Sequence, residues 1–242
     1  RQLPKNLLKE TWNDLKYLAS HKPLLRAALG ISFFWMLASL AQSNITLFAK
    51  YDFHLSETGA GVMLVVLVVG MATGSVLAGV MSRGRVELGL VPMGVGVIIG
   101  SSVLLCIVGW HVSVPESSNP AILLNLEDIA DVPAFWWSCV FLFTLGLGAG
   151  LFNVPLESFL QHRSDQQTRG TVIAAANFLA FSMMIVSAGL FFVMSEWIGF
   201  SSSTIFLMSG VLAVPVLIYV VWLLPYATVR FVVWIFSLAF YR

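Results

Sequence analysis

Charge is scarce in this sequence. Only 10% of the 242 residues are Asp, Glu, Lys or Arg, whereas 58% are hydrophobic. Soluble domains usually contain about 25% charged residues. Soluble domains of this total length are therefore excluded, because too little polar surface remains to cover them. The net charge is +1 and the basic residues are spread over several segments, which argues against the concentrated basic face of a nucleic-acid-binding protein.

Cysteine is also scarce, and the sequence shows no pattern typical of a catalytic or metal site. Cys106 and Cys139 both fall in apolar segments, where we expect them to pack as small apolar side chains and form no structural disulfide. No His, Cys, Asp or Glu residues have the spacing of metal ligands, and no nucleophile stands beside a base. We therefore expect no enzyme activity in this chain, no metal and no cofactor.

Long apolar segments are abundant. A run of about 20 apolar residues can cross the hydrocarbon core of a bilayer as a helix. The sequence therefore predicts an all-α membrane protein whose central region, residues 23–225, is a bundle of six spans. The predicted spans are Pro23–Phe48, Ser56–Met81, Glu87–Trp110, Ala134–Phe159, Gly170–Ile198 and Ser201–Pro225.

The basic residues fall on one side of these spans. Lys50 is the single exception among 13 Lys and Arg residues. The others are Arg1, Lys5, Lys9, Lys16, Lys22, Arg26, Arg83, Arg85, Arg163, Arg169, Arg230 and Arg242. Because positive charge marks cytoplasmic loops, we predict that both termini are cytoplasmic.

Two flanking segments have an interfacial character. Within residues 1–22, Leu8, Trp12, Leu15 and Ala19 recur at helical spacing, which predicts an amphipathic linker helix on the cytoplasmic surface. Residues 226–242 contain an aromatic-rich apolar run too short to span a bilayer. This run predicts an interfacial helix that could lead into a further domain.

Small residues recur every fourth position in three predicted spans. They are Gly70, Gly74 and Ala78 in the second span, Gly96 and Gly100 in the third, and Gly146 and Gly150 in the fourth. In lipid, such stripes let helix backbones approach closely. The pattern fits plain packing, and it also fits smooth surfaces that slide during transport.

Polar residues inside the spans are the candidate binding residues. Asn153, Glu157 and Gln161 are four apart and lie on one face of the fourth span. An ionisable residue at membrane depth is a functional candidate, although Glu157 could instead pair with Arg163. The further candidates are Gln42 in the first span and Asn177 in the fifth.

Two polar connections complete the set of candidates. Gly79, Arg83, Gly84 and Arg85 form a turn after the second span, which either sets the topology or acts as a gate by pairing with an acid on a neighbouring helix. The cytoplasmic loop between the fourth and fifth spans contributes Gln161, Arg163, Arg169 and Gly170.

These features resemble the C-terminal half of a major facilitator superfamily transporter. The glycine–arginine turn is similar to the signature of that superfamily, except that Ser82 stands near the place of its usual Asp. Residues 83–92 (RGRVELGLVP), 148–157 (GAGLFNVPLE), 160–163 (LQHR) and 169–177 (RGTVIAAAN) resemble the bacterial lysophospholipid transporter branch. Many members of that branch are fused to a glycerolipid acyltransferase, and residues 229–242 resemble the lead-in to it.

The resemblance implies that lysophospholipids, such as lysophosphatidylethanolamine, move across the bacterial inner membrane for re-acylation in the cytoplasm. The spans would be helices seven to twelve, paired with an N-terminal six-helix half that rocks about a shared cavity. The first, second, fourth and fifth spans would face that cavity, where Gln42, Asn153, Glu157 and Asn177 would meet the substrate. Two alternatives remain open: an exporter of drugs or small solutes, and a membrane anchor for a fused acyltransferase.

Overall fold

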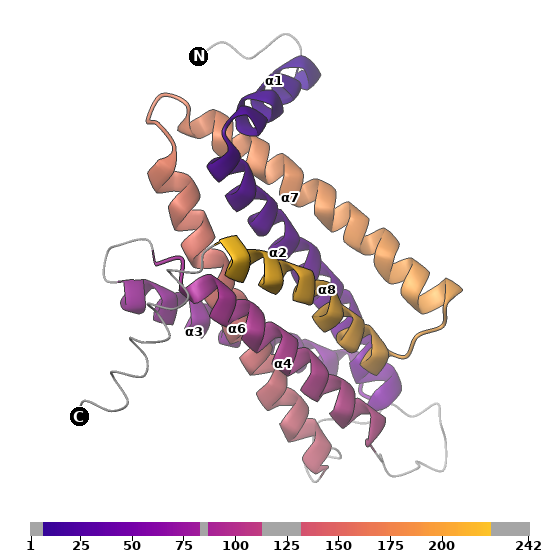
Figure 1. The fold of residues 1–242 in the computed structure, drawn as a ribbon. Helices are drawn as coiled ribbons and strands as arrows, with labels where there is room; N and C mark the ends of the chain where they lie inside the picture. The colour runs from indigo at the N-terminus through magenta and orange to yellow at the C-terminus, as the bar shows by residue number, and fades with distance from the viewer. Residues whose placement is uncertain (1–6, 83–86, 113–131, 224–242) are drawn as a thin grey trace, which may run out of the picture.

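The computed structural model describes residues 7–82, 87–112 and 132–223, in which the regular elements are helices (Figure 1). Six helices in these ranges are long and apolar enough to cross a membrane, which confirms the predicted fold class. The elements are α1 (Leu7–Ser20), α2 (Lys22–Leu47), η1 (Phe48–Asp52), α3 (Glu57–Ser82), α4 (Leu90–Trp110), α6 (Pro133–Arg163), α7 (Arg169–Phe192), η2 (Val193–Trp197) and α8 (Ser202–Leu223).

The first span is longer than the sequence predicts. A π-helical turn, η1, continues α2 as far as Asp52, whereas hydropathy places the end of this span near Phe48. The extension is held in place because Phe48 and Ala49 are completely buried. Asp52 therefore belongs to a helix end and not to a free loop. A second π-helical turn, η2, extends α7 in the same way.

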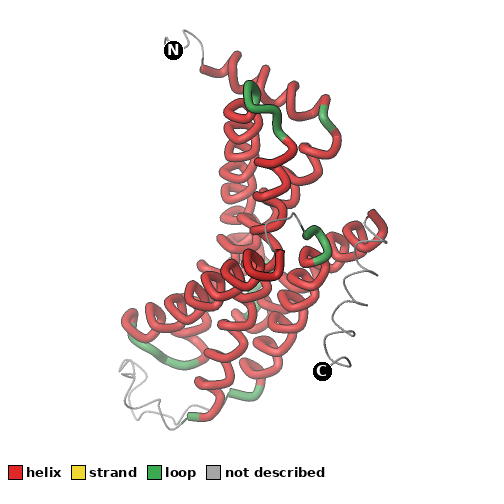
Figure 2. The backbone as a smooth tube through the Cα atoms, turned by 90° about the vertical axis from the view of Figure 1, so that its left-hand side faces the viewer, coloured by secondary structure: helices red, strands yellow, loops and turns green. Residues whose placement is uncertain are grey.

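The helix α6 contacts α2, α3 and α4, while α7 packs along α2 and α8 packs along α4. Figure 2 shows the described part of the chain as long helices joined by short connections. The N-termini of α2, α4 and α7 share one end of the bundle with α1, which we call the α1 end. The opposite end, where η1 and η2 lie, we call the Asp52 end. In the most apolar part of each span, only 22% of the residues of α3 and 17% of those of α7 are buried, against 50% for α2 and for α6.

The tightest helix contact is the seam between α3 and α6. A Cβ atom added to Gly74 would collide with the carbonyl oxygen of Leu147, and one added to Gly150 would lie 2.5 Å from the carbonyl oxygen of Met71. Gly70 and Gly146 meet the opposing backbone in the same way. This confirms the predicted close approach for the second and fourth spans, since only residues without side chains allow backbones this near.

The same prediction is wrong for the third span. Within the described residues, nothing lies within 4 Å of a Cβ added to Gly96 or Gly100. Close contact in α4 instead involves Gly94, whose added Cβ would lie 2.6 Å from the backbone nitrogen of Phe152. The spacing rule failed here because it identifies a smooth stripe but not the direction in which that stripe faces.

Both ends of the bundle have apolar packing of their own. At the Asp52 end, the Phe48 ring is edge-on to Phe53 and to Phe206, each at a centroid distance of 5.2 Å, and Phe53 in turn meets Phe135. At the α1 end, Leu18 of α1 is completely buried against residues of α2, α6 and α7. The helix α1 is thus fixed to the bundle.

The contacting face of α1 agrees with the predicted apolar stripe only in part, because Leu15 packs against the bundle but the closest contacts come from neighbouring residues. Leu18 is buried and the Tyr17 hydroxyl donates a hydrogen bond of 3.0 Å to Thr168 Oγ1, whereas the Trp12 side chain is 60% exposed with the Lys16 ammonium group 5.7 Å from the centre of its ring. The periodicity was dominated by Trp12, but tertiary contacts select the neighbouring face.

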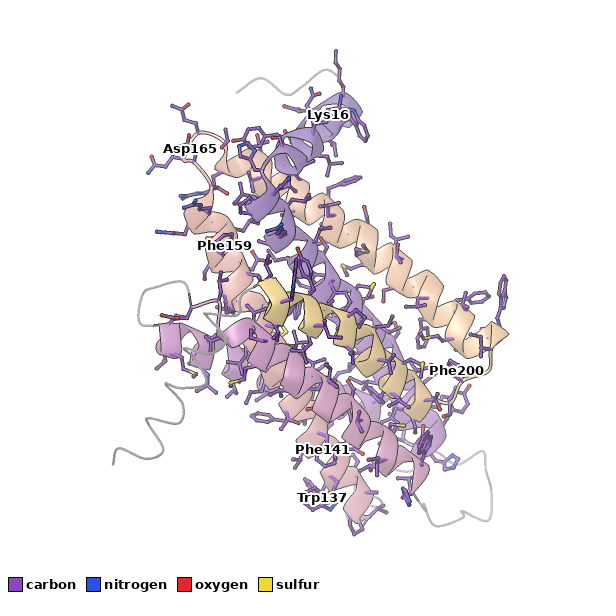
Figure 3. All side chains as sticks on the ribbon, in the orientation of Figure 1. Lys16, Trp137, Phe141, Phe159, Asp165 and Phe200 are labelled. Carbon is purple, nitrogen blue, oxygen red and sulfur yellow. The ribbon has the colours of Figure 1, made fainter. Side chains whose placement is uncertain are left out.

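Most exposed tryptophans among the described residues lie near helix ends, for example Trp137 near the start of α6 (Figure 3), whereas Trp35 is exposed in the middle of α2. Trp12 and Trp222 lie at the α1 end, and Trp110, Trp136, Trp137 and Trp197 lie at the Asp52 end. Tryptophan collects at the interfaces of a bilayer, where its ring is amphipathic. This arrangement agrees with a bundle that crosses the membrane with its two ends at the two surfaces.

Candidate functional site

The polar stripe of α6 is the best-defined candidate site. Asn153 and Glu157 are one helical turn apart and partly buried, and Gln161 follows one turn later at the exposed end of the helix. Pro155 lies inside α6 between the first two. Because a proline has no N–H, this turn lacks one backbone hydrogen bond, so the polar side chains occupy the irregular part of a long helix.

The helical period shows which way this stripe faces. Gly146 and Gly150 contact α3, while Leu156 touches Gly30 of α2, where an added Cβ would lie 2.8 Å from the Leu156 Cδ1 atom. With 3.6 residues per turn, Glu157 falls on the same stripe as Gly146 and Gly150, and Asn153 lies at the edge of that stripe toward Leu156. Both side chains are therefore on the α3 side of the helix.

Both side chains offer hydrogen-bond acceptors without partners. The Asn153 Oδ1 atom is buried and has no hydrogen-bond partner among the described residues. Within those same ranges, the partly buried Glu157 carboxylate accepts no hydrogen bond and forms no ion pair. The predicted alternative, a pair with Arg163, is not formed. Unpaired buried polar groups are costly, so a donor from outside these helices fits this site.

Of the two other predicted binding residues, Asn177 lies close to the level of Glu157 along the bundle, and Gln42 does not. In the parallel α2–α7 pair, Ser187 Oγ donates to the carbonyl oxygen of Met36 at 2.9 Å. Because the two helices are parallel, the residues ten positions before Ser187 and Met36, which are Asn177 and Arg26, lie at about the same level. Asn177 is exposed and begins the α7 stripe that continues through Phe181. Gln42 is exposed twelve residues beyond Gly30, about 18 Å away along α2.

The predicted gating turn falls largely outside the described residues. Gly79 belongs to the last turns of α3 and has open space around it, but Arg83, Gly84 and Arg85 lie outside the described ranges. The connection between α6 and α7 is described: Gln161, Arg163, Arg169 and Gly170 are all exposed at the α1 end. The predicted interfacial helix of residues 226–242 also lies outside the described ranges.

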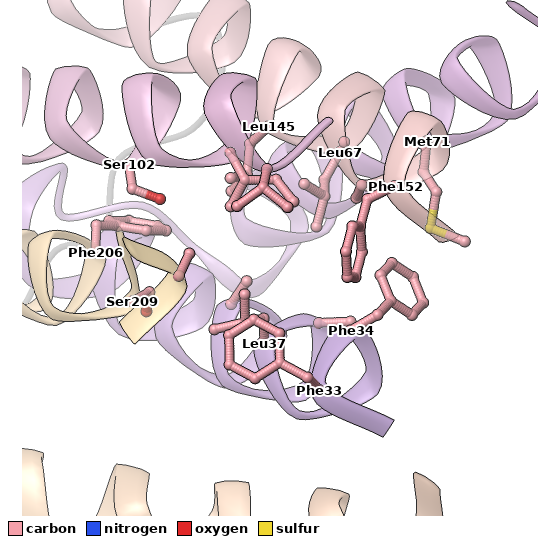
Figure 4. Close-up of a pocket in the computed structure, with 17 residues that line it drawn as sticks. Phe33, Phe34, Leu37, Leu67, Met71, Ser102, Leu145, Phe152, Phe206 and Ser209 are labelled. Carbon is pink, nitrogen blue, oxygen red and sulfur yellow. The ribbon is translucent and has the colours of Figure 1, made fainter. Parts of the chain in front are cut away.

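A cavity in the centre of the bundle is not a site for a polar substrate (Figure 4). Its volume is about 60 Å³ and its lining is almost entirely apolar, including Phe34, Leu145 and Phe152. Ligand pockets usually have about 300–1,000 Å³. This cavity is therefore a gap in the packing of α2, α3, α4, α6 and α8.

A second polar cluster, at the Asp52 end, is absent from the sequence-based candidates. The Asp52 carboxylate accepts hydrogen bonds from the hydroxyl groups of Ser202 and Ser203, the latter at 3.0 Å. The Asn44 side chain, also buried, donates to the carbonyl oxygen of Ser202 at 2.9 Å. These bonds fasten η1 and α2 to the start of α8. Sequence reasoning missed them because the partners are about 150 residues apart.

We predict that Asp52→Asn weakens this attachment. Hydrogen bonds to charged groups contribute about 1.5–3 kcal/mol, and an amide replaces only part of them, so the melting temperature should fall by roughly 3–6 °C for a loss of about 1.5 kcal/mol. Thermal unfolding in detergent measures this shift. Glu196→Gln is the matched control, because Glu196 is an exposed carboxylate beside the same cluster. Equal melting temperatures for Asp52→Asn and Glu196→Gln would contradict the assignment.

Within the described residues, no group of three or more His, Cys, Asp or Glu is arranged to hold a metal ion. Cys106 and Cys139 are both free and buried. On α6, the Asn153 and Glu157 side chains offer acceptors that have no hydrogen-bond partner among the described residues.

The comparisons with known proteins agree with this picture at the level of a family. Residues 1–188 match the sequence profile of the Major Facilitator Superfamily. No curated protein matches the chain, and no solved structure matches it.

Proposed function

The chain belongs to the major facilitator superfamily of membrane transporters, and from this premise we propose that it is one six-helix half of a transporter that moves lysophospholipids across the bacterial inner membrane. The observation that supports this most is the pair Asn153 and Glu157 on α6, whose acceptor oxygens have no partner among the described residues. A transporter needs such groups at membrane depth, whereas a bundle that served only as an anchor has no use for them.

The partner in this proposal is a second six-helix half. The helices α3 and α7 leave most of their surfaces uncovered, with exposed apolar residues such as Val68 and Val76 on α3 and Phe181 and Ile185 on α7. Asn177 is on the same exposed stripe of α7 as Phe181 and Ile185. A second half seated against these faces would enclose a cavity that contains Asn153, Glu157 and Asn177.

The chemistry of that cavity suits a cationic headgroup. The Glu157 carboxylate supplies a negative charge and Asn153 supplies a neutral acceptor one turn away. An ethanolamine ammonium group donates three hydrogen bonds, and charge-assisted bonds of this kind are about twice as strong as neutral ones. The acyl chain of a lysophospholipid would lie against the apolar remainder of α3 and α7. We therefore favour lysophosphatidylethanolamine as the substrate.

We propose that the α1 end is cytoplasmic. Lys16, Lys22, Arg26, Arg163 and Arg169 lie at this end, whereas Lys50 is the only Lys or Arg among the described residues at the other. Positive charge near the ends of spans is retained in the cytoplasm. Re-acylation of the lipid would then take place on this side, in an acyltransferase that is fused to the chain or separate from it.

An exporter of drugs or small solutes is the second candidate. The family allows it, and an unpaired carboxylate such as Glu157 could carry a proton as well as bind an ammonium group. The exporter would bind amphiphilic cations without regard to a phosphate.

Ligand-induced thermal stabilisation separates the two candidates. For the transporter with both halves, lysophosphatidylethanolamine at about 100 times its Kd should stabilise the protein by roughly 2.7 kcal/mol, which for a protein of twice this length is a rise in melting temperature of about 3 °C. Glycerophosphoethanolamine, which lacks the acyl chain, is the control. Stabilisation by lipophilic cations and not by the lysophospholipid would favour the exporter and contradict the proposal.

A further inference from the structure

A groove of about 550 Å³ opens at the α1 end, on the side of the bundle away from Glu157. Four helices line it: α2, α4, α6 and α8. On α6 its lining residues include Phe152, Leu156 and Phe159, whereas Asn153 and Glu157 are on the α3 side of that helix. The groove and the polar stripe of α6 are thus separate places on the same helix, and the groove volume falls within the range of about 300–1,000 Å³ for ligand pockets.

The groove combines one charge with a long apolar wall. Among the described residues that line it, Arg26 is the only charged one, and Val91, Leu156, Val216 and Val220 are among the apolar ones. The first turn of α2 contains no acidic residue, and the Arg26 guanidinium has no ion pair with any described residue. A positive charge at the edge of an apolar surface is complementary to an anionic group that carries a hydrocarbon chain.

A phenol lies at the same depth as this charge. Arg26 is four residues from the start of α2, and Tyr219 is four residues from the end of the antiparallel helix α8. Both line the groove, and the Tyr219 side chain is 44% exposed. The polar part of the groove is therefore at its mouth, where headgroups lie, and the apolar part extends toward the hydrocarbon core.

We propose that this groove is a docking site for the lysophospholipid, with its phosphate against Arg26 and Tyr219 and its single acyl chain along α4, α6 and α8. The identity of the ligand rests on the proposed function. The site is distinct from the proposed cavity between the two halves, in which the ammonium group meets Glu157. Substrate would occupy it on the lipid-facing side of the half, at the membrane surface where re-acylation takes place.

Photo-crosslinking tests the proposal. The probe is a lysophosphatidylethanolamine with a photoreactive group on its acyl chain, added to the complete transporter in vesicles of phosphatidylcholine, and the crosslinked peptides are identified by mass spectrometry. We expect adducts in α4 and α8. Arg26→Gln should lower their yield at least fivefold, and Arg26→Lys should retain most of it. Lys16→Gln is the matched control, because this substitution also removes one positive charge from the α1 end, whereas Lys16 does not line the groove.

Several outcomes would overturn the site. One is an equal adduct yield in Arg26→Gln and in the unaltered protein. Another is displacement of the probe by diacyl phosphatidylglycerol and not by unlabelled lysophospholipid, which would assign the groove to a bilayer lipid. A third is the absence of lipid adducts combined with a crosslink between a cysteine placed at Val220 and the segment 224–242. That segment follows directly after the lining residue Leu223, and this result would show that the chain itself fills the groove. Loss of transport with the adducts retained would instead refute the proposed function alone.

Discussion

Gly74→Leu is expected to produce the largest loss of stability of any single change considered for this chain. The Leu side chain would have to occupy the space of the Leu147 backbone, because even a Cβ atom at Gly74 collides with the Leu147 carbonyl oxygen. Overpacking costs about 1–3 kcal/mol, and separating α3 from α6 also loses contacts along the seam. For a cost of about 3 kcal/mol, the melting temperature should fall by roughly 6–12 °C.

Gly100→Leu is the matched control for this prediction. Gly100 belongs to the same kind of small-residue stripe, but nothing among the described residues lies within 4 Å of a Cβ at this position. Its melting temperature should change by less than about 2 °C, as for a surface substitution. Similar losses in both variants would contradict the seam. The milder Gly74→Ala should also lower the melting temperature, though by less than Gly74→Leu, because its Cβ alone collides with the Leu147 carbonyl oxygen.

Glu157→Gln is expected to slow the transport of lysophosphatidylethanolamine by at least tenfold. The substitution keeps the shape of the side chain and removes the charge that would bind the ammonium group. Bonds between charged partners contribute about 1.5–3 kcal/mol, and about 1.4 kcal/mol corresponds to a factor of ten in rate. The measurement is the initial rate of lipid movement in vesicles, at equal amounts of reconstituted protein.

Lysophosphatidylglycerol provides the control substrate, because its headgroup has no ammonium group. Its rate should change much less in Glu157→Gln than the rate for lysophosphatidylethanolamine. An equal loss for both lipids would show that Glu157 has a structural role. Unchanged rates for both would remove Glu157 from the binding site.

The spans were predictable from the sequence because hydropathy is a local property. The predicted and observed ends agree within a few residues for α3 and α8, for example, since each apolar run is bounded by polar residues. The π-helical turn that carries α2 on to Asp52 was not predictable in this way. It depends on the burial of Phe48 against Phe206, which lies far away in the sequence.

The candidate site was predictable only in part. Residues on one helix, such as Asn153 and Glu157, were correctly grouped because the helical period fixes their common face. Gln42 was grouped with them on polarity alone, and the structure separates it from them along α2. Arg26 was noted only as one of many basic residues, because its groove arises from four helices that the sequence does not place together.

The most direct test of the central claim is the movement of lysophosphatidylethanolamine across a sealed bilayer. The transporter with both halves is reconstituted into vesicles, and a labelled lysophosphatidylethanolamine is placed in the outer leaflet, where an added quencher or extracting protein can reach it. The account predicts that the accessible fraction falls at least several times faster than in protein-free vesicles, and that Glu157→Gln removes most of this acceleration. A rate equal to that of empty vesicles would contradict lysophospholipid transport.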